Sequence, residues 1–144
     1  MLGGSSMHWV APINSKETID AVLALKTWAV VGLGNNPERA AFGVAKLLQD
    51  KGHTIIPVYP RAEVVHGEVG YKTLAEIPVQ VDVVDCFVNS KLVGKVVDEA
   101  IAIGAKAVWL QLDVIDEEAV ARAQAAGLLT VMDRCPAIEY RARA

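Results

Sequence analysis

Three glycines, each followed closely by a short apolar run, constrain the fold of this chain most. Gly52, Gly104 and Gly127 each end a segment whose apolar residues recur at helical spacing. Glycine is favoured just past the end of a helix, and an unbroken apolar run is typical of a strand buried on both faces. Helices and buried strands therefore alternate along the chain, which predicts a parallel sheet covered by helices.

The expected elements follow from these runs and from capping residues. Asn14 with Glu17 resembles a capping box that begins a first helix. Later helices are expected to begin near Pro37, which suits a first helical position, and after the capping residues Ser90 and Asp116. The expected strands are residues 29–32, 54–59, 81–87, 107–110 and 128–132, with at most a short helix at 74–77.

Right-handed crossovers between these strands predict a single doubly wound, Rossmann-like α/β domain. We expect about five parallel strands, with helices on both faces of the sheet. Pro57 lies within the second strand and cannot donate a ladder hydrogen bond, so that strand is expected either to lie at an edge or to be irregular. Ligands of such a sheet bind beyond the carboxyl ends of its strands.

Composition limits the classes of function. The chain has 144 residues, 53% of them hydrophobic, and a net charge of −3 without a block of Lys or Arg, which argues against binding to nucleic acid or a membrane surface. Residues 1–12 are expected to be a flexible leader ahead of a domain over 13–144. The leader lacks the pattern of a signal peptide, and Cys86 and Cys135 lack metal-ligand spacing. We therefore expect a cytoplasmic protein with reduced thiols and no metal site.

A glycine-rich turn after the first strand is the strongest functional signal. It lies between a strand and a helix, where free backbone N–H groups and the helix dipole favour a phosphate group. The turn departs from the glycine pattern of dinucleotide-binding motifs, and the guanidinium of Arg39 can clamp a pyrophosphate there. The residues of this expected phosphate site are Gly32, Leu33, Gly34, Asn35, Asn36, Arg39, Ala40 and Ala41.

The end of the second strand indicates which nucleotide is bound. Proteins that bind NAD carry an acid there to hold the ribose hydroxyls. This strand instead ends in Tyr59, Pro60 and Arg61. A cation suits a ribose that carries a phosphate, which leaves NADP or coenzyme A as the expected ligand.

Several blocks of sequence resemble the small stand-alone CoA-binding domain proteins. These blocks are residues 30–34 with Pro37 and Arg39, 56–60, 67–69 with Tyr71, 81–87, 105–112, and 126–127 followed by 132–135. The resemblance runs in order from about Ile13 to Tyr140. That family is similar to the N-terminal domain of the succinyl-CoA synthetase α-subunit, whose Rossmann fold binds CoA through its first glycine turn and its strand ends.

The resemblance implies roles for particular residues. The turn from Gly34 to Ala41 would hold the CoA phosphates, Pro60 and Arg61 would flank the nucleotide, and Phe87 with Val88 would line the adenosine side. The chain also departs from the family pattern at three positions. Gly34 stands where serine is common, Val88 where arginine is usual, and Asp113 where glycine is expected. The last two changes are expected to weaken CoA binding.

No catalytic residues can be identified in this pattern. His53, His66, Cys86 and Cys135 are each expected to be structural or solvated. The sequence therefore predicts a small CoA- or acyl-CoA-binding protein that is not catalytic alone, with a protein partner or homo-oligomer as further expectations. One alternative is an NADP-dependent oxidoreductase or other nucleotide-using enzyme. Another is a partner-binding scaffold with a vestigial pocket.

Overall fold

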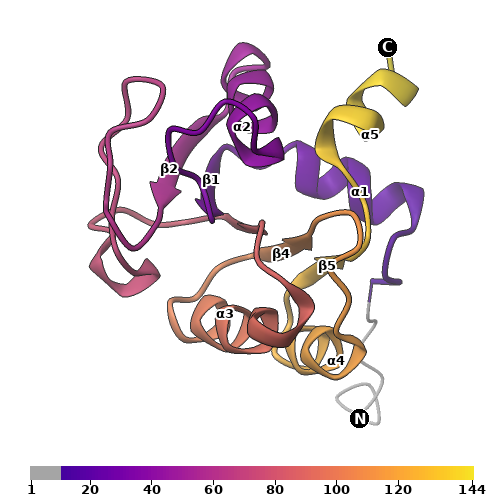
Figure 1. The fold of residues 1–144 in the computed structure, drawn as a ribbon. Coiled ribbons are helices and arrows are strands. Elements are labelled where there is room, and N and C mark those ends of the chain that lie inside the picture. The colour runs from indigo at the N-terminus through magenta and orange to yellow at the C-terminus, as the bar shows by residue number, and fades with distance from the viewer. Residues whose placement is uncertain (1–10) are drawn as a thin grey trace, which may run out of the picture.

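Five short apolar runs form one parallel sheet in the computed structural model, which describes residues 11–144 (Figure 1). The strands are β1 (Thr27–Val31), β2 (Thr54–Val58), β3 (Val83–Cys86), β4 (Ala107–Leu110) and β5 (Leu129–Val131). Their order is β2-β1-β3-β4-β5, and every pairing is parallel. The expected doubly wound parallel sheet is confirmed, and the strand with Pro57 does lie at an edge. Residues 1–10 of the expected leader lie outside the described residues.

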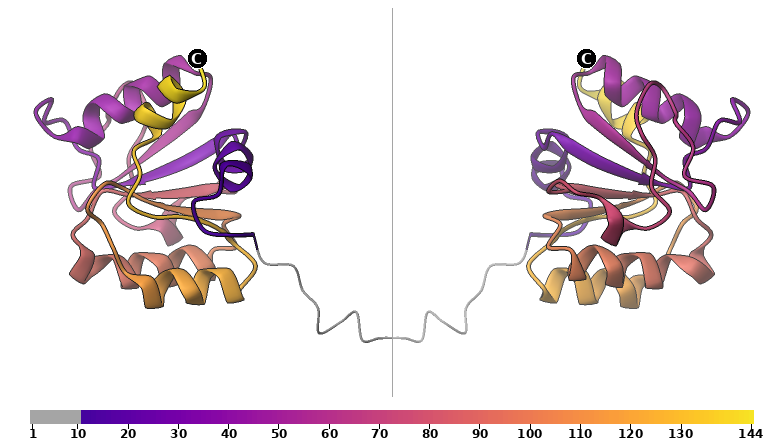
Figure 2. Two further views of the ribbon diagram at one scale, coloured as in Figure 1. Left: turned by 90° about the vertical axis from the view of Figure 1, so that its right-hand side faces the viewer. Right: turned by 90° about the vertical axis from the view of Figure 1, so that its left-hand side faces the viewer.

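Helices cover both faces of this sheet, as expected. They are α1 (Lys16–Leu23), α2 (Ala40–Asp50), α3 (Ser90–Ala102), α4 (Glu117–Ala125) and α5 (Pro136–Ala142), and a short 3₁₀ helix, η2 (Leu74–Glu76), lies between β2 and β3. Figure 2 shows α3 and α4 on one side of the strands and α2 and α5 on the other. Two buried clusters match these layers, because successive strand side chains point to opposite faces: Val84 packs with α3 and α4, and Val83 packs with α1 and α2. Among residues 11–144, no helix combines the length and the apolar character needed to cross a bilayer.

Two of the expected capping residues were wrong by one position. The cap of α1 is Ser15, whose hydroxyl accepts from the Thr18 N–H, while Asn14 pairs through its side chain with both backbone groups of Met132. The cap of α3 is Asn89, because its carboxamide oxygen accepts two N–H groups of the first turn. The Ser90 hydroxyl instead accepts from the Ile115 N–H, which holds the loop between β4 and α4 against α3.

Helix α2 begins three residues later than Pro37, the start predicted from sequence. Residues 36–39 form a tight turn in which the Arg39 N–H donates to the Asn36 carbonyl at 3.1 Å. Proline at the second position of such a turn is favoured because its φ angle is already correct. The Asn36 side chain also accepts from the Glu38 N–H at 3.0 Å. Arg39 is therefore the N-cap residue of α2 and not part of its first turn.

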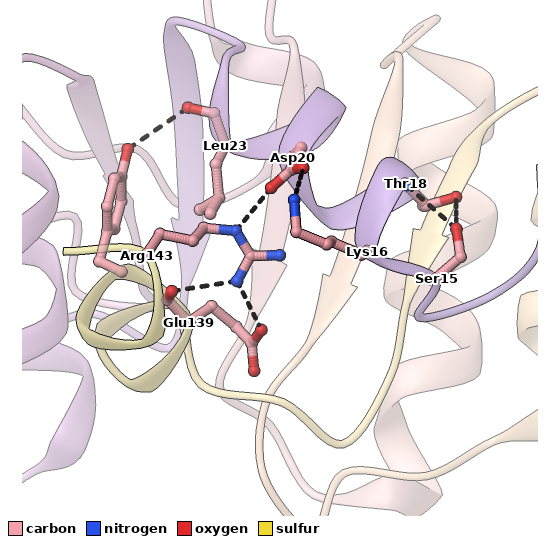
Figure 3. Close-up of polar contacts among 8 residues, drawn as sticks. Ser15, Lys16, Thr18, Asp20, Leu23, Glu139 and Arg143 are labelled. Atoms are coloured by element: carbon pink, nitrogen blue, oxygen red, sulfur yellow. Dashed lines mark hydrogen bonds and ion pairs between the residues drawn. The ribbon is translucent and has the colours of Figure 1, made fainter.

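The C-terminal helix α5 was not predicted from the sequence. It begins with Pro136 directly after Cys135 and packs beside α2. Arg143 ties this helix to α1, because its guanidinium donates to Asp20 at 2.6 Å and to Glu139 at 3.0 Å (Figure 3). Hydrogen bonds from Lys16 and Arg143 lower the pKa of Asp20. The two ends of the described chain are thus joined across the sheet edge.

His53 also joins α5 to the sheet, at the start of β2. Its Nδ1 lies 2.8 Å from the Leu25 carbonyl, so Nδ1 carries the proton and the neutral Nε2 accepts from the Tyr140 hydroxyl. The Trp28 ring packs against the imidazole at 60°. Burial lowers the pKa of His53 from its usual 6.5. The expectation that this histidine is structural agrees with these contacts.

A pH dependence of stability follows from His53. Because its pKa is lowered on folding, the unfolded chain takes up a proton more readily, so this histidine makes the fold less stable as pH falls below about 6.5. Relative to a His53→Gln variant, the wild-type protein should lose free energy of unfolding between pH 7 and pH 5. Urea unfolding of both proteins at three pH values measures the difference. A difference that stays constant with pH would contradict this role for His53.

Candidate functional site

The crevice forms where neighbouring strands send the chain in opposite directions. After β1 the chain crosses to β2, whereas after β3 it crosses to β4 on the other side. In a doubly wound sheet this switch point is the usual ligand site. Gly32 leaves β1 with φ of +99°, and a Cβ atom there would overlap the carbonyl oxygen of Phe87 at the end of β3. Glycine is therefore required for the two strand ends to approach each other.

Three adjoining cavities lie beyond these strand ends. The first, here called the turn cavity, has a volume of about 210 Å³ and is lined by Gly32, Gly34, Asn35, Asn36, Arg39, Tyr59, Arg61 and Glu63. The second, the strand-end cavity, has about 500 Å³ and is lined by Val31, Gly32, Arg39, Val58, Tyr59, Pro60, Lys72, Phe87, Val88, Asn89 and Leu92. Arg39 belongs to both cavities, so they form one continuous crevice.

The third cavity, here called the apolar cavity, lies between the start of α2 and the loop that follows β4. It has a volume of about 360 Å³ and is lined by Arg39, Ala40, Ala41, Val44, Phe87, Val88, Asn89, Gln111, Leu112, Asp113, Val114 and Cys135, four of which (Arg39, Phe87, Val88 and Asn89) also line the strand-end cavity. Arg39 therefore contributes to all three cavities and stands where they meet. The crevice has a polar compartment at the glycine turn and an apolar compartment beside α2.

The structure brings nearly all of the sequence-predicted site residues to this crevice. Eleven of the twelve line at least one cavity. The exception is Leu33, which is completely buried in the core beside α2. The binding roles assigned to these residues stay predictions.

Electrostatically, the crevice is rich in cations and in free N–H groups. Arg39, Arg61 and Lys72 line it, and none of the three forms an ion pair with the acidic residues of the described chain. Helix α2 points its N-terminus at the crevice without a side-chain cap, whereas α1, α3 and α4 are each capped by a side chain. This arrangement favours an anionic ligand.

Among the lining residues that sequence reasoning missed are Lys72 and Glu63, whereas Tyr59 was expected at the end of the second strand without a role in the site. Tyr59 lies beside Gly34, with ring atoms 3.2 Å from where a Cβ of that glycine would stand. Lys72 reaches the crevice because Tyr71 pairs with Val58 and extends the sheet edge by one residue. Glu63 lies in the turn cavity although it follows β2 by five positions. Only Glu63 had a usable signal, since an acid near the end of the second strand is the feature that NAD-binding folds share.

Two of the three positions where the chain departs from the family pattern lie at the apolar cavity, and the third, Gly34, lines the turn cavity. Val88 and Asp113 are the two that line the apolar cavity. Asp113 has φ of +67°, a left-handed conformation that glycine adopts without strain, and its N–H donates to the Asp133 carboxylate at 2.7 Å. The backbone here keeps the shape that suits glycine, while the side chain adds a negative charge. This compartment therefore differs most from the expected pattern.

One buried carboxyl lies directly behind the crevice. Asp85 in β3 has no exposed surface, its Oδ1 accepts from the Gln111 side chain at 2.5 Å, and its Oδ2 has no hydrogen-bond partner within the described chain. Burial raises the pKa of Asp85 to about 8, so at pH 7 most molecules carry it as the neutral acid. Gln111 continues to the surface of the apolar cavity and links the carboxyl to the crevice wall.

Of the other candidate nucleophiles and bases, Cys86 and His66 have structural surroundings, whereas Cys135 lines the apolar cavity. Cys86 is buried, which raises its pKa well above its usual value. Cys135 is half-buried and precedes α5. The His66 Nε2 lies 2.8 Å from the Phe42 carbonyl, and its ring packs on the Phe42 ring. Over residues 11–144, His, Cys, Asp and Glu side chains form no group that could hold a metal ion.

Comparisons with known proteins point to one family. Residues 26–141 match the model of the CoA binding domain. The uncharacterized protein YneT of Bacillus subtilis (strain 168) is 34% identical over 122 residues, which are 84% of this chain and 90% of that protein. A structure of a hypothetical protein from Pyrococcus horikoshii OT3 has a TM-score of 0.85 at 38% identity and covers 94% of this chain and 98% of its own.

A larger relative shares only this domain. The alpha subunit of ADP-forming acetate–CoA ligase II from Pyrococcus furiosus is 36% identical over 81 residues. Those residues are 56% of this chain but 18% of that subunit. The similarity therefore concerns one part of the larger protein.

Proposed function

Because this chain belongs to the CoA binding domain family, we propose that it binds coenzyme A or an acyl-CoA in the crevice beyond β1 and β3. The single observation that carries the proposal is the meeting of three cavities at Arg39, beside the uncapped N-terminus of α2. A ligand with a charged nucleotide end and a long, less polar arm matches a crevice with one polar and one apolar compartment.

Each compartment suits one part of such a ligand. The turn cavity, with its two arginines and the backbone of the glycine turn, suits the pyrophosphate. The strand-end cavity, with Pro60, Phe87 and Val88, suits the adenosine. The apolar cavity remains for the thioester arm or an acyl group, since its walls are largely Ala, Val and Leu side chains.

We further propose that the protein acts as a ligand carrier, sensor or partner of an enzyme, and not as an enzyme alone. His53, His66 and Cys86 have structural surroundings, and Cys135 lines the apolar cavity without a hydrogen bond to a histidine or a carboxylate of the described chain. The name of the Pyrococcus furiosus relative refers to a ligase acting with CoA, but this chain spans only 18% of that subunit. Its reaction is therefore not carried over to this chain.

Ligand-dependent stability tests the proposal. CoA at a hundred times its Kd should raise the free energy of unfolding by about 2.7 kcal/mol, because a ligand that binds only the folded state stabilises it. Thermal unfolding is measured with CoA, acetyl-CoA and NADP in parallel. Stabilisation by NADP without stabilisation by CoA would favour the oxidoreductase alternative. No effect of any nucleotide would favour the scaffold alternative.

Arg39→Ala gives the corresponding prediction for the site. Removing a guanidinium that contacts a phosphate should weaken CoA binding by about tenfold to a hundredfold. Arg141→Ala is the matched control, because Arg141 is exposed on α5 and lines none of the three cavities. Titration calorimetry compares both variants with the wild type. Equal affinities in all three proteins would remove Arg39 from the binding site.

A further inference from the structure

One acidic side chain already occupies the glycine turn. The Glu63 Oε1 accepts from the Asn35 backbone N–H at 3.2 Å. The Asn35 side chain donates to the Val64 carbonyl at 2.9 Å, so the loop after β2 is fixed to the turn by two contacts from one residue. A Cβ atom at Gly34 would stand 3.2 Å from the same carboxylate oxygen. The small residue at position 34 thus leaves room for this carboxylate.

Glu63 is also the one acid among the residues that line the turn cavity. It is half-buried and shares the cavity with Arg39 and Arg61, yet it forms no ion pair within 4.0 Å among the described residues. Its main polar contact is therefore the N–H group that a phosphate would be expected to meet. A carboxylate in this place supplies the negative charge for which the turn is built.

We propose that Glu63 is an internal anion of the glycine turn, which an incoming phosphate group must displace. The identity of the ligand rests on the proposed function, but the competition itself does not. A ligand has to replace the hydrogen bond of the carboxylate and overcome its charge. The turn therefore selects ligands that bring more than one negative charge, such as a diphosphate, over neutral or singly charged ones.

The opposite role makes the opposite prediction. An acid near the end of the second strand can accept hydrogen bonds from ribose hydroxyls, and in that case it contributes to binding. Removing the charge of Glu63 would then weaken the binding of a nucleotide. If Glu63 competes with phosphate, removing its charge strengthens binding. The sign of the change distinguishes the two roles.

The experiment compares Glu63→Gln with Glu68→Gln. Both substitutions remove one negative charge from the same loop, but Glu68 lines none of the three cavities. Titration calorimetry at low salt uses two probes, CoA and inorganic pyrophosphate, because pyrophosphate tests the turn without a nucleotide. We expect Glu63→Gln to bind both about tenfold more tightly than the wild type, and Glu68→Gln to bind both as the wild type does.

A second variant and an NMR signal show whether a change in affinity comes from the lost charge or from misfolding. Glu63→Ala should bind the probes at least as tightly as Glu63→Gln. The amide resonance of Asn35 in a ¹H–¹⁵N spectrum should shift in Glu63→Gln without ligand, since its acceptor loses its charge, and resonances of the sheet should not. Adding pyrophosphate to the wild-type protein should shift the same amide.

The outcomes separate this inference from the proposed function. Tighter binding of pyrophosphate to Glu63→Gln with no binding of CoA to any protein supports the internal anion and refutes the proposed ligand. Weaker binding of CoA to Glu63→Gln overturns the inference and assigns Glu63 to the ligand contacts. Equal affinities of Glu63→Gln and Glu68→Gln for both probes also overturn it, as does a failure of both probes to bind to any of the proteins.

Discussion

Replacing Asp85 with asparagine should raise the free energy of unfolding by about 3 kcal/mol at pH 7 and change it little near pH 4. The pKa of this buried carboxyl is about 8 in the folded protein, against 3.8 as its usual value. Between those two values the folded state keeps a proton that the unfolded state releases. Wild-type stability therefore decreases as pH rises, by about 1.4 kcal/mol per pH unit for this group.

Asparagine removes this pH-dependent loss while keeping the shape of the side chain. Its carboxamide oxygen still accepts from Gln111, although the amide adds unpartnered N–H groups that offset part of the gain. Urea unfolding from pH 4 to pH 8 measures the difference between variant and wild type. A difference that does not increase with pH would show that Asp85 is not held protonated.

Asp82→Asn provides a control of opposite sign beside the same strand. Asp82 is half-buried, accepts from the Thr27 N–H at 3.0 Å and pairs with Lys106 at 3.6 Å. Its carboxylate is stabilised by these partners, so the substitution should lower the free energy of unfolding at pH 7. A gain for Asp82→Asn as well would indicate a general effect of net charge.

Gly32→Ala should lower the free energy of unfolding by about 4 kcal/mol. The added methyl group would overlap the Phe87 carbonyl oxygen, and the backbone φ of +99° is strained for any residue with a side chain. Gly52→Ala is the matched control, because Gly52 has almost the same φ, +96°, but open space around its Cβ position. That variant should lose only about 1 kcal/mol, which is the cost of the conformation alone.

The difference between the Gly32→Ala and Gly52→Ala losses gives the free energy that depends on the close approach of the ends of β1 and β3. Chemical denaturation of both variants gives the two free-energy differences. If they are equal, backbone conformation accounts for the whole effect, and the packing of β1 against the Phe87 carbonyl contributes nothing. Unequal losses would show that the crevice depends on the absence of a side chain at position 32.

The sheet can be predicted well from the sequence because apolar runs mark its strands and glycines mark the helix ends, and both signals lie within a few residues of the element they define. Each expected strand is an apolar run, and the proline in the second strand indicates its edge position without knowledge of its neighbours. The membership of the CoA-binding domain family expected from the sequence is also confirmed. The start of α2 was wrong, because the turn at Asn36 and Pro37 competes with a helix through hydrogen bonds that spacing does not reveal.

The features that were missed depend on contacts between distant parts of the chain. Helix α5 has only seven residues, and Arg143 and Tyr140 hold it against α1 and β2. Glu63 reaches the glycine turn through a loop whose path no periodicity describes. The raised pKa of Asp85 arises because the folded sheet and its covering helices exclude water from the carboxyl group. Each case needs the tertiary arrangement before its chemistry can be recognised.

Both borders of the sheet are closed by single residues. Tyr71 occupies the open side of β2 through hydrogen bonds with Pro57 and Tyr59, and Asn14 does the same beyond β5 by bonding to Thr130 and Met132. Exposed strand borders are the usual starting points for fibrous aggregation, since their unpaired peptide groups attract other chains. Joining of the sheets of two copies into a continuous ribbon is therefore disfavoured at these positions.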